Sequence, residues 1–85
     1  MVRASKVAND SGQVSLAELR TGASAQVMSL AAAAPRERGK LMSLGVMPGA
    51  TVELLQRFPS YIIAIGHTQL ALDRETAELI QVLRV

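Results

Sequence analysis

The sequence predicts an all-β protein, a small barrel of five strands with two or three short helices in the connections. Five short stretches have strand-like patterns, and no predicted helix is long enough to cover the face of a sheet. The chain has 85 residues, and a chain of this size buries only roughly 60% of the surface that its unfolded form exposes. Closing the sheet removes edges that so small a protein could barely protect. An open α+β sheet with one covering helix is the alternative.

The first part of the chain has the least regular pattern. Residues 1–12 are small and polar without periodicity, so we expect a loose tail, followed by one barrel domain over residues 13–85. Ser15 and Glu18 have the capping-box spacing. This spacing predicts a short helix that buries its leucines and ends at Gly22.

A first strand and a second helix come next. Residues 25–30 have the pattern of a strand. Pro35 suits the first turn of a helix that we expect over residues 36–44. Gly39 lies in the middle of this helix, where it costs about 1 kcal/mol relative to alanine. Propensity alone therefore makes this helix weak.

The segment from Leu41 to Gly49 combines a helix end with a tight turn. Leu41 and Leu44 are three residues apart, so we expect them to share the core-facing side of the helix. Gly45 follows at once, where a left-handed residue ends a helix without a Cβ penalty. Pro48 and Gly49 suit the two central positions of a type II turn. The segment predicts helix, stop and turn, and a strand follows it.

The second half is more regular, and its predicted strands span residues 51–56, 61–65, 68–72 and 80–85. Gly66 and His67 separate two of these strands, and glycine at the first of two central residues is typical of a type II′ hairpin. Asp73 is the expected N-cap of a short helix that ends at Leu79.

No constellation of residues points to catalysis, a cofactor or a metal site. The chain has no cysteine, hence no disulfide and no thiolate ligand. His67 is its single histidine, which leaves no nucleophilic triad, and we interpret it as a solvated turn residue. The glycines form neither a Walker A pattern nor a dinucleotide fingerprint. The carboxylates are too scattered for a ferrous site; they include Glu53, Asp73, Glu75 and Glu78.

The charge pattern does not favour nucleic acid. Nine Lys and Arg against seven Asp and Glu give a formal charge of only +2, and one Phe and one Tyr make no stacking platform. Arg36, Arg38 and Lys40 form the only basic cluster, interrupted by Glu37. These cations could steer an acidic partner by long-range attraction. The alternative is that they form an ordinary solvated helix face.

Location follows from two absences in the sequence. There is no run of 18 apolar residues to span a membrane. The first residues carry two positive charges but no apolar stretch behind them, unlike a secretory signal peptide. We therefore expect a cytoplasmic protein that meets a membrane only through a partner.

Apolar side chains that the barrel cannot bury are the candidate docking surface. Nearly half of the residues are hydrophobic, so some apolar area should remain outside. Our candidates are Met42, Val46 and Met47, because methionine suits adaptable contacts. The alternative is that they fill the core. Phe58 and Tyr61 could add a groove for an extended peptide.

Several of these elements together resemble the FeoA family. The matching elements, in order, are Leu16-x-x-Leu19-x-x-Gly22, Leu41-x-x-Leu44-Gly45-Val46-x-Pro48-Gly49, the Gly66 hairpin, Leu70-Ala71-Leu72 and Ala77-x-x-Ile80-x-Val82. The resemblance covers about residues 14–85. Each element is common by itself, whereas the five in this order and spacing are specific.

The resemblance implies an SH3-like barrel that serves bacterial ferrous-iron uptake. Its partner would be the cytosolic region of a FeoB-type permease, which carries a GTPase domain. The barrel would act by docking, with no chemistry of its own. An SH3-like module that binds peptides or regulates another protein is the alternative, and a metal sensor or nucleic-acid binder is a third hypothesis. An apolar patch on so small a protein could also pair with a second copy.

Overall fold

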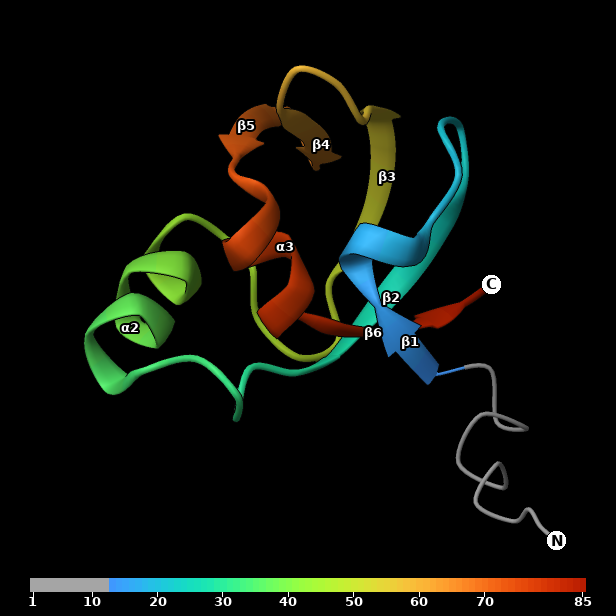
Figure 1. Ribbon diagram of the computed structural model, residues 1–85. Helices are drawn as coiled ribbons and strands as arrows, with labels where there is room; N and C mark the ends of the chain where they lie inside the picture. The colour runs from blue at the N-terminus through green and yellow to red at the C-terminus, as the bar shows by residue number, and fades with distance from the viewer. Residues whose placement is uncertain (1–12) are drawn as a thin grey trace, which may run out of the picture.

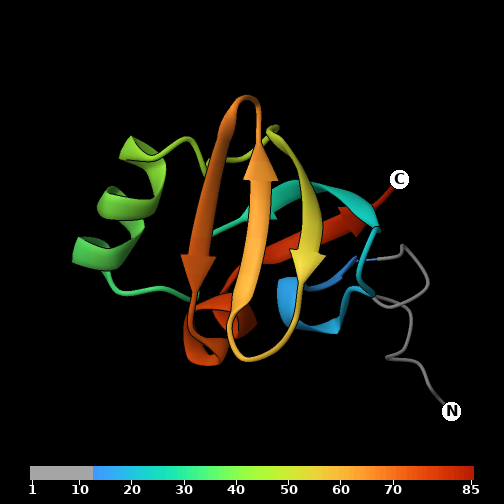
Figure 2. The same ribbon diagram turned by 90° about the horizontal axis from the view of Figure 1, so that it is seen from above.

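Six antiparallel strands form one sheet in the order β1-β6-β2-β3-β4-β5 in the computed structural model, which describes residues 13–85. The strands are β1 (Gln13–Ser15), β2 (Ser24–Ser29), β3 (Thr51–Gln56), β4 (Tyr61–Ile65), β5 (Thr68–Leu72) and β6 (Gln81–Arg84). The connections carry a 3₁₀ turn, η1 (Leu16–Glu18), and the helices α2 (Pro35–Ser43) and α3 (Arg74–Leu79) (Figure 1). The sheet is strongly curved, with β3, β4 and β5 in front of β2 and β6 in Figure 2.

The predicted small barrel with short helices is confirmed. It has six strands, however, where five were predicted. β1 was missed because three residues are too few to show a period, and they are extended because they pair with β6, Val14 opposite Val82. The predicted closure of the sheet is not achieved by strand pairing among the described residues, since β1 and β5 are its two edges. The predicted tail, residues 1–12, lies outside the described residues.

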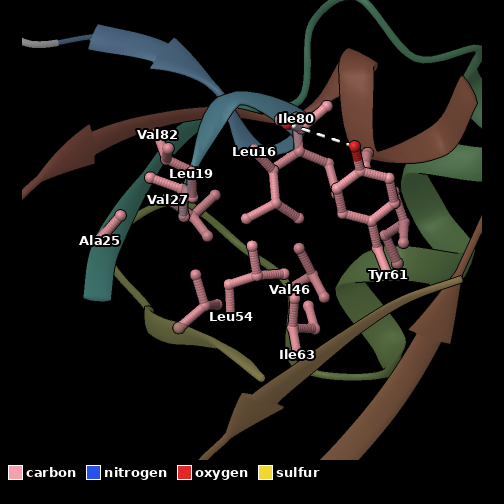
Figure 3. Close-up of a cluster of buried hydrophobic side chains, with 14 of the residues drawn as sticks. Leu16, Leu19, Ala25, Val27, Val46, Leu54, Tyr61, Ile63, Ile80 and Val82 are labelled. Carbon is pink, nitrogen blue, oxygen red and sulfur yellow. Dashed lines mark hydrogen bonds between the residues drawn. The ribbon is translucent and has the colours of Figure 1, made fainter. Parts of the chain in front are cut away.

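The core lies inside the curve of the sheet and is closed at one end by η1 and α3, which pack on each other (Figure 3). Leu16 and Leu19 come from η1 and its C-cap, and Ile80 comes from the C-cap of α3; all three are fully buried. They meet Leu54 and Ile63 from the sheet. Short helical turns therefore fill the space that strand pairing leaves open.

The first helical segment differs from its prediction. Ser15 precedes a single 3₁₀ turn, but its side chain makes no capping hydrogen bond. Leu19 is already extended, and Gly22 lies in the turn that follows, with φ +92°. A single 3₁₀ turn suffices because residues i and i+3 eclipse in this geometry, so Leu16 and Leu19 enter the core together.

The end of α2 is a Schellman motif. Gly45 has φ +100° and donates its N–H to Met42 O at 3.0 Å, while the Val46 N–H donates to Leu41 O at 2.9 Å. This pair of bonds defines the motif, which brings the residue after the glycine onto the helix. Val46 is accordingly 0% exposed, beside Leu41 in the core, whereas Leu44 at the C-cap is 43% exposed. The stop at Gly45 is confirmed; the predictions that Leu44 faces the core and that Val46 lies outside are wrong.

The other turn predictions are confirmed. Gly49 has φ +97°, and the Ala50 N–H donates to Met47 O at 3.0 Å, as in a type II turn around Pro48 and Gly49. Gly66 has φ +59° in the hairpin between β4 and β5. Asp73 caps α3 by accepting a hydrogen bond from the Thr76 N–H at 2.7 Å.

Two glycines of the α2 segment should respond in opposite ways to alanine. Gly45→Ala should lower the free energy of unfolding by about 1–2 kcal/mol, because a left-handed backbone is strained with a Cβ. The added atom itself would meet only Ile65 Cγ2, at an ordinary 3.6 Å. Gly39→Ala should raise the free energy of unfolding by up to about 1 kcal/mol, since alanine favours the helix and nothing lies within 4 Å. Urea denaturation of both variants measures the difference, and equal effects would contradict the assigned helix end.

Candidate partner-binding surface

α2 stands at the side of the barrel with most of its surface exposed (Figure 2). Leu41 is its only buried residue. Pro35 occupies the first turn as predicted, but the helix spans Pro35–Ser43 where residues 36–44 were expected, and it ends at the Schellman motif. A helix held by a single buried leucine presents its other side chains to the surroundings.

The three predicted cations do not form one cluster. Arg36 and Lys40 are four residues apart on the exposed surface, so they share a face of α2. Arg38 is half-buried and lies two positions from each, which places it on another side of the helix. None of the three forms an ion pair among residues 13–85, where the only pair joins Arg74 and Glu78 at 3.0 Å. The exposed cations are thus free to face an acidic partner.

The prediction that Met42, Val46 and Met47 lie on the surface is correct for the two methionines and wrong for the valine. Met42 and Met47 are each 41% exposed, whereas Val46 belongs to the core. Sequence reasoning missed Leu44 and Met28, the latter 40% exposed at the register shift between Val27 and Ser29 of β2. The alternation of the buried Ala25 and Val27 already placed Met28 on the outer face of its strand, so that signal was available. The role of these side chains in binding stays a prediction.

The two aromatic residues do not make a peptide groove. Tyr61 is 5% exposed, and its hydroxyl donates to Ala17 O at 3.3 Å (Figure 3). Arg57 lies over its ring, 5.8 Å from the centroid, and donates to the same carbonyl at 3.1 Å. Phe58 is 85% exposed in the β3–β4 connection. Tyr61 is therefore a core residue, and the prediction of a Phe58–Tyr61 groove is wrong.

A groove that the sequence did not predict lies between α2 and the end of β5. Its volume is about 260 Å³, and its lining residues are Glu37, Lys40, Leu41, Leu44, Ala71, Leu72, Asp73 and Thr76. A second hollow of about 310 Å³ shares three of these residues and is lined by Glu37, Asp73, Glu75, Thr76, Glu78 and Leu79. The lining of the first hollow is half apolar and half polar or charged, and the second is rich in carboxylates.

Metal chemistry has no visible basis in the described part of the chain. No group of three or more His, Cys, Asp or Glu side chains within residues 13–85 is arranged to hold a metal ion. His67 lies exposed in the β4–β5 turn.

No helix within residues 13–85 is long and apolar enough to cross a membrane. The surface offers apolar and charged contacts for another molecule.

The fold and this surface define a class: a small SH3-like barrel that exposes apolar and charged contacts. The model of the FeoA domain matches residues 14–84, so the chain belongs to the FeoA family. This family comprises accessory domains of ferrous-iron transport and is not a family of enzymes. The predicted resemblance and fold class are therefore confirmed.

Solved structures agree with this assignment. FeoA from Chlorobium tepidum is 33% identical and has a TM-score of 0.79, covering 85% of this chain and 70% of that one. FeoA from Stenotrophomonas maltophilia, described as a prokaryotic SH3 domain protein and solved with zinc, is 28% identical at a TM-score of 0.66, covering 81% of this chain and 88% of that one. IdeR from T. acidophilum shares the fold alone, at 14% identity and a TM-score of 0.79, with 86% of this chain covering 34% of that one. No curated protein matches the chain.

Asp73 contributes a charge at the junction of the two hollows. The pKa of its carboxyl lies below the ordinary value because it accepts hydrogen bonds from Thr76, first from the backbone N–H and then from the side chain. The lowered pKa extends the range in which this carboxylate is ionised further into acidic pH.

The hydrogen bond by which Asp73 caps α3 should make the free energy of unfolding depend on pH in acidic solution. Since the folded-state pKa is lowered, the contribution of Asp73 is complete above the unfolded value of about 3.9 and is lost as the pH falls through the folded value. Asp73→Ala should therefore be less stable than the parent at pH 7, and the difference should narrow below about pH 4. Asp73→Asn is the matched control, because asparagine caps a helix without titrating. Thermal denaturation between pH 2 and pH 7 measures both, and a gap that widens in acid would contradict the cap.

Proposed function

We propose that the protein is a cytoplasmic accessory subunit of bacterial ferrous-iron uptake that docks on the cytosolic region of a FeoB-type permease. Membership of the FeoA family over residues 14–84 is the observation that carries this proposal. The barrel acts as a protein ligand of the transporter and performs no reaction. It reaches the membrane only through the permease.

The proposed contact, the outer face of α2, is the exposed part of the helix with the turn that follows it: Arg36 and Lys40 lie on one side of the helix, Met42 lies on another, and Met47 lies in the turn. All four side chains are exposed, and neither cation has an ion-pair partner within residues 13–85. Free cations raise the rate of encounter with an acidic surface. The methionines adapt their shape to the partner, because the side chain is unbranched and polarizable. Charge thus guides the approach, and apolar burial supplies the affinity.

A charge placed in the apolar part of this face should abolish docking. In titration calorimetry with the soluble cytosolic domain of the FeoB from the same genome, we expect micromolar binding, and at least about a tenfold weakening by Met47→Glu. Desolvation of the unpaired carboxylate is the reason. Phe58→Glu is the matched control, because it adds the same charge at an exposed position outside this face.

Each outcome of this titration has a definite meaning. Binding that both variants retain would keep the function and reject the α2 face. No binding by a folded parent would reject the docking proposal in favour of a barrel that serves another protein. Weakening by Phe58→Glu alone would place the contact at the β3–β4 connection.

The encounter should also depend on salt. Raising the ionic strength from about 0.05 to 0.5 M should slow association of the parent, because screening shortens the reach of Arg36 and Lys40. The double change Arg36→Gln with Lys40→Gln should remove most of this salt dependence and leave the dissociation rate nearly unchanged. Stopped-flow mixing at several salt concentrations measures the association rate and the dissociation rate of the parent and of the double variant. A dissociation rate that rises instead would make the two cations part of the buried contact.

A further inference from the structure

The outer edge of β5 has free backbone groups. β5 pairs only with β4, in a hairpin whose flanking residues are Ile65 and Thr68. In a two-residue hairpin the flanking pair exchanges both of its backbone hydrogen bonds, and bonded and non-bonded pairs then alternate. Gln69 and Ala71 are therefore at non-bonded positions, so their N–H and C=O groups point away from β4. Within residues 13–85 no strand and no loop hydrogen bond reaches this edge.

This free edge borders the groove between β5 and α2. Ala71 and Leu72 line one wall, and Leu41 and Leu44 of α2 line the other. Figure 2 shows β5 as the strand of the front layer that lies nearest to α2. Leu44 is 43% exposed here, so its side chain is accessible to another molecule. The groove thus offers a polar backbone edge beside an apolar wall.

The charges of the groove select the occupant. Glu37 and Asp73 line both hollows, and Lys40 is the one basic residue in the lining of the first. Glu75 and Glu78 line the second, where no basic side chain takes part, so carboxylates outnumber cations along the groove. Glu78 is paired with Arg74. Glu37 and Glu75 have no ion-pair partner among the described residues. An extended chain that passes along β5 would carry its cations toward these carboxylates.

We propose that the edge of β5 and the adjoining groove bind an extended protein segment by strand addition, with an apolar side chain against Leu41, Leu44 and Leu72 and a Lys or Arg near Glu37 and Glu75. Main-chain hydrogen bonds to Gln69 and Ala71 give affinity, and side chains in the groove give specificity, as in other edge-binding domains. Side chains of the segment alternate, so those on the face of Leu70 and Leu72 point into the groove. This site adjoins the outer face of α2 at Lys40, which lines the groove, whereas Arg36, Met42 and Met47 line neither hollow.

A synthetic peptide tests the site on the full chain. The probe is a labelled nonapeptide of alternating Lys and Val with Leu at its centre, and the control peptide has Glu in place of every Lys. We expect saturable binding of the basic peptide in fluorescence anisotropy, weakened at least about tenfold for the acidic one. Because the probe is a designed peptide and no segment of the permease, its binding is independent of the docking proposal. Equal binding of the two peptides would overturn the charge assignment.

Strand addition makes a sharper prediction in the backbone. Only alternate amides of an added strand face β5, so N-methylation of one alternating set should abolish binding while methylation of the other leaves it nearly unchanged. In hydrogen-exchange NMR the amides of Gln69 and Ala71 should become protected on binding, whereas those of Leu70 and Leu72, already bonded to β4, should change little. If both methylated peptides bind equally, or if Gln69 and Ala71 gain no protection, the proposal is wrong.

Protein variants complete the test. Leu44→Asp and the double change Glu37→Lys with Glu75→Lys should each weaken the basic peptide at least about tenfold. Glu53→Lys is the matched control for charge, because Glu53 is exposed on β3 and lines neither hollow. All of these positions are exposed, so thermal denaturation should find the variants folded. Protection of Gln69 and Ala71 that rises with protein concentration alone would make a second copy the occupant and overturn the proposal.

Discussion

The Schellman motif at the end of α2 is the constraint on which the surface of this protein depends. Two backbone hydrogen bonds close around Gly45, and they require the left-handed conformation that glycine adopts without strain. They bring Val46 onto Leu41, and this pair is the part of the α2 segment that enters the core. Except for the half-buried Arg38, the other side chains of the helix are exposed. A different helix end would exchange buried and exposed residues along the whole segment.

That exchange explains the exposed leucine. Leu44 lies at the C-cap, where the chain turns away from the helix axis, and so it cannot follow Leu41 inward. It becomes one wall of a groove whose other wall is β5. The same motif therefore anchors α2 and leaves an apolar strip beside an unpaired strand edge. A small core cannot cover both sides of so short a helix.

The sheet of residues 13–85 ends at β1 on one side and at β5 on the other. β1 has three residues and pairs with β6, and β5 pairs with β4 at the other end. Among the described residues, the space between these two edge strands holds no further strand pairs. It is filled by the leucines of η1 and its C-cap and by the residue that ends α3. Packing replaces hydrogen bonding there, so the barrel is filled while β5 keeps free backbone groups.

Local chemistry in the sequence determined the turns, the Asp73 cap and most strands. Gly45, Gly49, Gly66 and Asp73 each require a particular backbone geometry, and three of the five predicted strands have the predicted bounds, since short-range sterics decide them. The tertiary structure alone decided the strand β1, the single turn of η1, and which apolar residues face inward. These depend on contacts between segments far apart in the chain, as Tyr61 with Ala17 shows. The groove and its carboxylates could not be predicted for the same reason. They are lined by residues of α2, β5 and α3, and no local pattern in the sequence shows which elements become neighbours.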